Sequence, residues 1–473
     1  MKTQSLILTT LLMMSSMLQA ALKPAPLLTD NMVLQRNAEV KLWGTAKANE
    51  KITVVTSWNK ARYSTTSNSN GEWTVKVLTT EAGGPYTIAL ASLTEKATLK
   101  NILLGEVWLC SGQSNMEMTL SGFTDSPING AFDALMQADN SNIRLFTVKR
   151  AAIASPQDTC SGSWEVSTAE TAARFSAVGY FYAMQLQKAL HVPIGMICSS
   201  WGGSRIEAWI NKETMADFPD ALKRTTQEKT WQHHRASNLY NGMIHPLVNY
   251  KIKGAIWYQG ESNRSEYFDY AALMNGMVSS WRKEFDAGEF PFYFVQIAPH
   301  AYNDNKSRLS AKFCDEQLSA ATLIPNSGMV VTTDLGDERN IHPAEKNTVA
   351  KRLSAWALAE TYRLKGIPHK NTCYKSVEVA DSTLIVSFDN TDMGISVCGK
   401  TLSDFEIAGD DKVFFPATAW LRFGKKQVVV MAPQVKHPVA VRYRYCNYPS
   451  GNGLLYNLWG LPVPSFRSDD WKD

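Results

Sequence analysis

The stretch from residue 99 to residue 366 constrains the fold most, because short apolar runs alternate there with helical stretches. Runs of this length bounded by polar residues are typical of strands buried on both faces. Helical stretches such as 179–190 and 270–285 separate them. This alternation predicts an α/β domain with a mostly parallel sheet and helices on both faces. The expected strands are 107–110, 194–198, 255–258, 292–297 and 329–332.

The segments on either side of this stretch have a different pattern. Apolar and polar residues alternate at 73–77 and again at 384–388, which is the period of half-buried strands. No candidate catalytic cluster falls within the first of these segments. We therefore expect an N-terminal β-sandwich domain over 22–98, the α/β domain over 99–366, and a C-terminal β domain over 371–473.

Residues 1–20 are typical of a secretory signal peptide. Lys2 supplies a positive start, residues 6–14 form a short apolar run, and Ala20 is a small residue suited to cleavage. A membrane anchor is the alternative, but the run is too short to span a bilayer comfortably. We expect export to the periplasm or the exterior, and no membrane span after cleavage.

Charge and cysteine usage bear on partners and cofactors. The formal net charge is +4 at pH 7, one unit of which comes from Lys2, and no run of Lys or Arg stands out. This gives no support for nucleic-acid binding. The seven cysteines match no zinc spacing, so we expect no metal and no other cofactor. Export would permit a disulfide among Cys373, Cys398 and Cys446. The oligomeric state is left open.

The end of the first central strand carries a candidate nucleophile. Gly112-Gln113-Ser114-Asn115-Met116 follows the run 107–110. A buried strand that ends in a glycine and then a serine presents that serine at the carboxyl edge of the sheet, where ligands bind.

A serine hydroxyl needs a base to remove its proton before it can act as a nucleophile. His342, in Ile341-His342-Pro343, follows the strand 329–332 and a short polar loop, so it can reach the same edge; Pro343 is expected to begin the next helix.

Two kinds of group are candidates for orienting His342. The loop 334–340 contains three acids, but the position three residues before the histidine is Arg339. Asp334 lies at the strand end and is the preferred carboxylate, with capping or turn formation as its alternative role. A backbone carbonyl could serve instead, which would leave a serine–histidine dyad.

An ester reaction also needs donors for the developing oxyanion. The backbone N–H of Ser114 is the first expected donor. Gly202 or Gly203, in the turn after strand 194–198, is the second, because glycine lets a backbone N–H approach a ligand closely. An ordinary tight turn is the alternative for this pair. The side-chain amide of Gln259 is the third expected donor.

These motifs resemble the SGNH-type hydrolase superfamily, specifically its sialate O-acetylesterase branch, and also certain acetylxylan esterases. The resemblance runs over most of the chain, and the block 257–263, Trp-Tyr-Gln-Gly-Glu-Ser-Asn, is present intact. It implies that Ser114 is the nucleophile, His342 the base and Gln259 an oxyanion donor. With the signal-like N-terminus and the absence of a metal-ligand spacing, it leads us to expect an exported, metal-independent sialate O-acetylesterase. Many superfamily members have an aspartate where this chain has Arg339, so the third catalytic member stays open.

Substrate contacts are expected from residues beside the same motifs. Arg205 could meet the carboxylate of an acidic sugar through a bidentate contact, with a salt bridge to Glu207 as its alternative. Glu261 and Asn263 are the other expected substrate-binding residues. Two rival functions are an acetylxylan esterase and a non-catalytic carbohydrate-binding protein. A complete set of nucleophile, base and oxyanion donors favours an enzyme, because binding alone needs no nucleophile.

Overall fold

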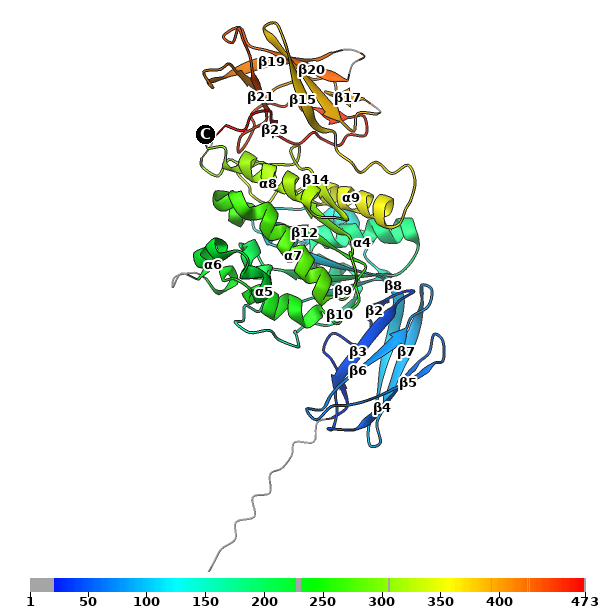
Figure 1. Ribbon diagram of the computed structural model, residues 1–473. Coiled ribbons are helices and arrows are strands. Elements are labelled where there is room, and N and C mark those ends of the chain that lie inside the picture. Colours follow the sequence, from blue (N-terminus) through cyan, green and yellow to red (C-terminus); the bar gives the residue numbers. More distant parts are fainter. Residues whose placement is uncertain are drawn as a thin grey trace, which may run out of the picture.

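The computed structural model describes residues 21–226, 231–304, 307–392, 394–422, 424 and 426–471. The expected signal peptide lies outside the described residues. Along the chain a β domain comes first, an α/β domain with its helices follows, and a second β domain ends the chain on the opposite side of the molecule (Figure 1).

A buried, mostly parallel sheet forms the centre of the α/β domain. Its strands are β8 (Lys96–Gly112), β9 (Asn140–Thr147), β10 (Trp164–Ser167), β11 (Ile194–Ser200), β12 (Gly254–Tyr258), β13 (Phe292–Val295) and β14 (Ser327–Val330). They lie in the order β10-β9-β11-β8-β12-β13-β14. Neighbours pair in parallel, except that β10 is antiparallel to β9 at one edge. All the predicted strands lie in this sheet, and β14 begins and ends two residues earlier than predicted.

Helices cover both faces of this sheet, as the alternation predicts. They include α4 (Ala177–Leu190), α7 (Tyr270–Glu284), α8 (Leu309–Leu323) and α9 (Lys346–Trp356). Successive residues of a strand point to opposite faces. On β12, Ile256 and Tyr258 therefore pack in the core beneath α4 and α9, whereas Ala255 and Trp257 pack in the core beneath α7 and α8. The first residue of α9 is Lys346, so the expectation that Pro343 begins the helix is wrong.

Strand β8 joins the N-terminal domain to the central sheet. Residues 96–104 of β8 pair with β7 (Gly83–Ala91), and residues 103–105 pair with β2 (Val33–Gln35). Residues 106–112 then pair with β11 and β12. The domain boundary predicted at residue 98 therefore falls inside one continuous strand.

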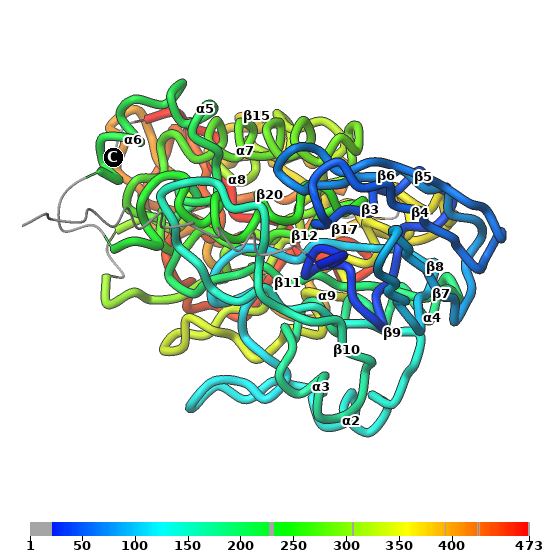
Figure 2. Tube along the Cα trace, turned by 90° about the horizontal axis from the view of Figure 1, so that it is seen from below, coloured from blue at the N-terminus to red at the C-terminus, as the bar shows by residue number. Residues whose placement is uncertain are grey.

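The N-terminal domain consists of two packed β layers. One contains β1 (Lys23–Pro24), β3 (Glu39–Thr45) and β6 (Glu72–Leu78), and the other contains β4 (Lys51–Thr56), β5 (Arg62–Thr66) and β7. Side chains of β6 are alternately exposed and buried, which is the predicted period. Figure 2 shows these strands gathered at one side of the molecule.

The C-terminal domain is a β structure packed against α8. Its strands are β15 (Cys373–Ala380), β16 (Thr383–Asp389), β17 (Ile395–Ser396), β18 (Phe405–Ala408), β19 (Phe414–Arg422), β20 (Gln427–Met431), β21 (Ala440–Tyr443), β22 (Tyr456–Asn457) and β23 (Phe466–Arg467). Leu384 and Val386 are buried in its core, as the alternation predicts. The Tyr445 hydroxyl donates a 2.6 Å hydrogen bond to Asp315 on α8, which ties the domain to this helix of the α/β domain.

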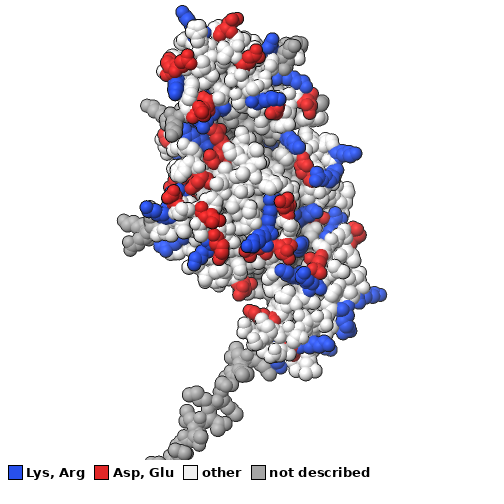
Figure 3. Space-filling view, in the orientation of Figure 1, with Lys and Arg blue, Asp and Glu red and all other residues white. Residues whose placement is uncertain are grey.

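Each of the seven cysteines carries a free thiol, so the disulfide that export would permit is not formed in this structure. None of the helices in the described ranges is both long and apolar enough to cross a membrane. On the face shown in Figure 3, acidic and basic side chains are interspersed.

Candidate active site

Ser114 lies where β8 ends at the carboxyl edge of the sheet, and it is the first residue of the short helix α1 (Ser114–Glu117). The turn before it requires a glycine. Gly112 has a φ of 138°, and a Cβ there would approach the Tyr258 carbonyl oxygen to 2.2 Å. The sharp turn leaves the Ser114 side chain partly exposed at the sheet edge.

His342 lies in the loop between β14 and α9 and reaches the same edge. Its Nε2 atom is 2.9 Å from the Ser114 Oγ, although the two residues are 228 positions apart in sequence. A separation of this size allows direct proton transfer between the hydroxyl and the imidazole. The structure therefore brings together the expected nucleophile and the expected base.

The surroundings of His342 favour its neutral form. Burial is the main cause that lowers its pKa, with further lowering from the positive charges of Lys346 and His300, and the pKa falls from 6.5 to about 4. The Phe123 ring lies edge-on to the imidazole, with the ring centroids 5.2 Å apart. At neutral pH the imidazole is uncharged, so its Nε2 can accept a proton.

This pKa predicts how activity depends on pH. His342 must be neutral to act as a base, so kcat/KM should be constant above about pH 5 and should fall as the pH drops through about 4. The measurement is kcat/KM for acetate release between pH 3 and about 8, with folding followed by circular dichroism at each pH. A fall in kcat/KM centred near pH 6.5 would instead show that the folded protein does not lower the pKa of His342.

Asp334 does not contact His342, so its expected role as the orienting acid is not met here. Its carboxylate accepts two hydrogen bonds from Arg352 on α9, at 2.8 and 2.6 Å, and the two side chains are 13% and 10% exposed. The planar guanidinium matches a carboxylate in this paired geometry. No residue within the described ranges hydrogen bonds to Nδ1 of His342. The arrangement is that of a serine–histidine dyad.

We expect Asp334→Asn to lower stability rather than catalysis. The variant keeps the shape of the side chain but removes the charge that pairs with Arg352, so unfolding should become easier by about 2 kcal/mol. The hydrolysis rate of the folded variant should stay within about tenfold of wild type, since the loss of an orienting acid costs up to about 10⁴-fold. Thermal melts and acetate-release rates measure the two effects. A thousandfold loss in folded protein would restore Asp334 as a third catalytic member.

The backbone turn after β11 lies directly beside the nucleophile. The Trp201 N–H donates a 3.0 Å hydrogen bond to the Gly112 carbonyl, and a Cβ on Gly202 would lie 3.3 Å from the Ser114 Cβ. Gly202 donates its N–H to Glu117 Oε2 at 2.8 Å, so that donor is occupied. The N–H groups of Ser114 and Gly203 make no hydrogen bond to another described residue. Both N–H groups are therefore available to an oxyanion.

Gln259 has a structural role in place of the expected oxyanion contact. Its side chain is fully buried, and its amide donates to the Ser204 carbonyl at 3.0 Å and to Asn263 Oδ1 at 2.8 Å. Its Oε1 accepts a 2.7 Å hydrogen bond from Tyr270. Both amide hydrogens are therefore occupied, and the side chain connects the 201–204 turn to the loop after β12.

Arg205 and Asn263 also differ from the substrate-binding role expected of them. Arg205 forms ion pairs with Glu207, at 3.4 Å, and with Glu266. Its alternative role as a salt-bridge partner of Glu207 is therefore the one that the structure contains. Asn263 is 1% exposed and donates a 2.9 Å hydrogen bond to Glu207 Oε2. Asn263 is therefore not free to contact a sugar, and the Arg205 side chain is held by its two acidic partners with 16% of its surface exposed.

The sequence patterns did not identify two buried residues next to the dyad, Asn115 and Lys346. Lys346 Nζ lies 2.6 Å from Asn115 Oδ1, and Asn115 Nδ2 lies 2.5 Å from Glu261 Oε1. Glu261, expected to bind substrate, is thus turned inward to Asn115. One sequence feature could have identified Lys346. A lysine in the first turn of a helix places its positive charge unfavourably with respect to the helix dipole, which indicates that the residue has a specific role.

The rim of the site contains aromatic and basic groups. The Trp201 ring stacks on His233 with centroids 5.1 Å apart and planes 7° apart. The Arg150 guanidinium lies 5.4 Å from the Trp201 ring and forms a 2.6 Å ion pair with Glu117. Arg150 was not predicted, because it lies in a segment with no distinguishing pattern. These side chains lie beside the 201–203 turn that flanks Ser114.

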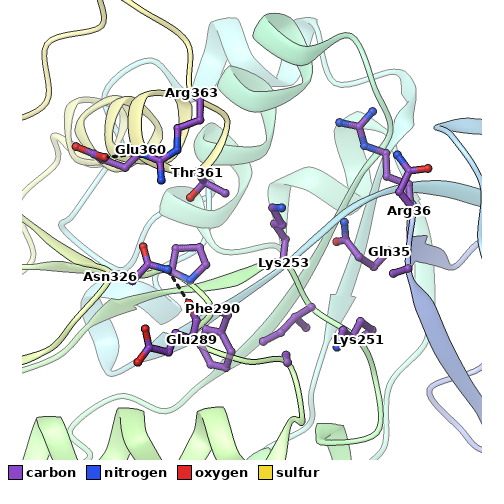
Figure 4. A pocket seen from close by; sticks show the side chains of 15 residues that line it. Gln35, Arg36, Lys251, Lys253, Glu289, Phe290, Asn326, Glu360, Thr361 and Arg363 are labelled. Carbon is purple, nitrogen blue, oxygen red and sulfur yellow. Dashed lines mark hydrogen bonds and ion pairs between the residues drawn. The ribbon is translucent and has the colours of Figure 1, made fainter.

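A separate cavity of about 400 Å³ lies at the opposite edge of the sheet, where β12, β13 and β14 begin. Figure 4 shows Lys253, Glu289 and Asn326 in its lining, with Arg36 from the N-terminal domain. It contains neither Ser114 nor His342, so it is not part of the candidate active site. Over the described part of the chain, no three His, Cys, Asp or Glu side chains gather as a metal site would require.

Comparisons with known proteins place the chain among esterases. The family described as carbohydrate esterase, sialic acid-specific acetylesterase, matches residues 104–362. The sialate O-acetylesterase of Mus musculus is 26% identical, over 92% of this chain and 92% of its own length. That of Homo sapiens is 28% identical, over 93% of this chain and 91% of its own length. The crystal structure of a carbohydrate acetylesterase from Xanthomonas citri has a TM-score of 0.86 at 31% identity, covering 95% of this chain and 100% of that one.

Proposed function

This chain belongs to the carbohydrate esterase family of sialic acid-specific acetylesterases, and from that premise we propose that it hydrolyses O-acetyl esters of sialic acid through Ser114 and His342. The 2.9 Å contact between Ser114 Oγ and His342 Nε2, at the carboxyl edge of a parallel sheet, carries the proposal. The strand-end nucleophile and the layered sheet also support assigning the central domain to the SGNH-type hydrolases.

The first half of the reaction forms an acetyl-enzyme. Ser114 Oγ attacks the acetyl carbonyl carbon while His342 Nε2 accepts the hydroxyl proton. The oxyanion of the tetrahedral intermediate accepts hydrogen bonds from the N–H groups of Ser114 and Gly203. When the intermediate collapses, the ester C–O bond breaks and the imidazolium of His342 gives its proton to the departing sugar oxygen.

The second half regenerates the free enzyme. His342 takes a proton from a water molecule, and the resulting hydroxide attacks the acetyl carbon of the acetyl-enzyme. The bond to Ser114 Oγ then breaks, the proton on His342 returns to that oxygen, and acetate leaves. Because the pKa of His342 is about 4, the imidazole is ready to act as a base in both halves at neutral pH.

Two observations support an O-acetylated sialic acid as the substrate. The mouse and human relatives, which match this chain over nearly its whole length, are named for that substrate. At the rim, Arg150 is about half exposed and uses Nε and Nη2 to bind Glu117, which leaves Nη1 without a partner among the described residues. A guanidinium N–H is a suitable donor for the sugar carboxylate. Arg205 is also ion-paired, but only 16% of its side chain is exposed, so it contributes less to this argument.

The test is a side-by-side measurement of acetate release from O-acetylated sialic acid and from acetylated xylan. We expect kcat/KM on the sialic acid ester to be at least about tenfold higher, as one charge-assisted contact allows. The opposite order would favour an acetylxylan esterase with the same dyad. Release from neither substrate, with no reaction toward a serine-reactive phosphonate, would favour a carbohydrate-binding protein.

We also propose that the protein is exported, on the strength of the positive start and short apolar run in residues 1–20. The N-terminal sequence of the protein recovered from its native cells tests this. A mature chain that starts directly after Ala20 is expected, and recovery of the full chain from the cytoplasm would contradict it.

A further inference from the structure

Lys346 is a buried lysine that the reaction described above does not use. It is 0% exposed and begins α9, four residues after His342. Its Nζ donates a 2.6 Å hydrogen bond to Asn115 Oδ1 and a 2.9 Å hydrogen bond to the Pro343 carbonyl. Fully burying an ammonium group is costly unless it is paired, so this contact set needs an explanation.

Asn115 connects this lysine to the rest of the site. It follows Ser114 directly and is also 0% exposed. Its Nδ2 donates to Glu261 Oε1 at 2.5 Å and to the Ile341 carbonyl at 3.1 Å. Both amide hydrogens and the amide oxygen are engaged, so the side chain of Asn115 is held from both ends.

These contacts reach the backbone on both sides of the base. Ile341 precedes His342 and Pro343 follows it, and the backbone carbonyl of each accepts a hydrogen bond from the network. The other end of the network is the residue next to the nucleophile. The positions of Ser114 and His342 are therefore coupled by buried hydrogen bonds that do not involve either catalytic side chain.

We propose that Lys346 is a positioning residue that acts through Asn115 to hold His342 against Ser114, the task that an orienting carboxylate performs in a triad. This inference rests on the proposed function, because it assumes that the Ser114–His342 pair does the chemistry. It accounts for a base whose Nδ1 has no hydrogen-bond partner among the described residues. Fixing the backbone on both sides of the imidazole restricts the ring without a contact to the ring itself.

The network does not depend on the charge of Lys346. Burial lowers the pKa of Lys346 to about 7, against the opposing effect of Glu261, while burial raises the pKa of Glu261. A neutral amine still has two N–H donors, and the network uses two. The hydrogen bonds therefore persist on both sides of neutral pH, and the charge of Lys346 acts on catalysis only by lowering the pKa of His342.

The test compares Lys346→Met with Lys351→Met, which changes an exposed lysine on the same helix. Two rates are measured on folded protein: the labelling of Ser114 by a phosphonate, and the hydrolysis of a small non-sugar acetate ester. We expect Lys346→Met to lower kcat and the labelling rate about 100-fold, the cost of a displacement near 1 Å, with KM within about threefold. Its acid limb should move up from about 4 by a small amount, since the charge of Lys346 is gone while the larger effect of burial remains. Lys351→Met should match wild type.

A second variant, Asn115→Ala, separates positioning from a general loss of stability and decides the matter if Lys346→Met does not fold. When two residues act as one unit, removing both costs little more than removing either one. The double variant Lys346→Met with Asn115→Ala should therefore lose about as much activity as the less active of the two single variants. Two results would overturn this inference without affecting the proposed function. One is an undiminished labelling rate in either folded single variant, and the other is a loss of activity in the double variant equal to the product of the two single losses. Failure of the wild type to be labelled at Ser114 would overturn the proposed function as well.

Discussion

Replacing Ser114 by alanine is expected to lower kcat for acetate release by at least about 10⁴-fold. The substitution removes the Oγ that forms the acetyl-enzyme, and no neighbouring hydroxyl replaces it in the contact with His342 Nε2. Water attack assisted by the remaining groups should give only a small residual rate. The measurement is acetate release under saturating substrate, with a detection limit well below one thousandth of the wild-type rate.

The fold of Ser114→Ala should be unchanged, because among the described residues the Oγ hydrogen bonds only to His342, and Ser114 lies at the sheet edge. Circular dichroism and thermal melting check this. Ser121→Ala, which changes an exposed serine in the loop that follows, is the matched control and should keep full activity. More than about a tenth of wild-type activity in folded Ser114→Ala would exclude Ser114 as the nucleophile.

Replacing His342 by glutamine is expected to cost about as much as the loss of Ser114, and the two losses should not add. Glutamine preserves polarity but cannot take up the serine proton, so Ser114 stays a weak neutral hydroxyl. In the double variant Ser114→Ala with His342→Gln, kcat should fall no further than in the worse single variant, because the two side chains act as one unit. The measurement is kcat for all three variants at pH 7 and at about pH 9.

His437→Gln, which replaces an exposed histidine of the C-terminal domain, is the control for this series. Its rate should equal that of wild type. A His342→Gln variant that keeps activity within about tenfold of wild type would mean that another group deprotonates Ser114, and the dyad would then be rejected.

The elements of the central domain could be predicted because each has its own local pattern. The strands around Val107 and Ala255 are continuous apolar runs, and burial on both faces makes such runs. Strand β9 was missed because Asn140–Thr147 begins with polar residues. Strand β14 was placed two residues late, since the apolar run continues beyond the residues that pair with β13. An apolar pattern indicates which residues are buried, whereas the bounds of a strand depend on which residues hydrogen bond to its neighbour. The two therefore need not coincide.

The nucleophile and the base could be predicted for a related reason, because both follow buried strands at the same sheet edge. For Arg205, the ion pair with Glu207 two residues away was already predicted as its alternative role. The roles of Gln259 and Asp334 could not be predicted, because their partners come from other segments: Tyr270 for Gln259, and Arg352, 18 residues away, for Asp334. A side chain's partner depends on which elements pack together, and the local sequence does not contain that information.

The most direct test of the whole account is to locate the phosphonate adduct by mass spectrometry of the labelled, digested protein. A single adduct on the peptide that contains Ser114 is expected in wild type, formed at a rate that parallels the loss of acetate release. No adduct should form in Ser114→Ala, and its formation should be at least about 100-fold slower in His342→Gln. Full inactivation with the adduct on any other residue, or full activity with Ser114 completely labelled, would contradict the central claim that Ser114 attacks the ester.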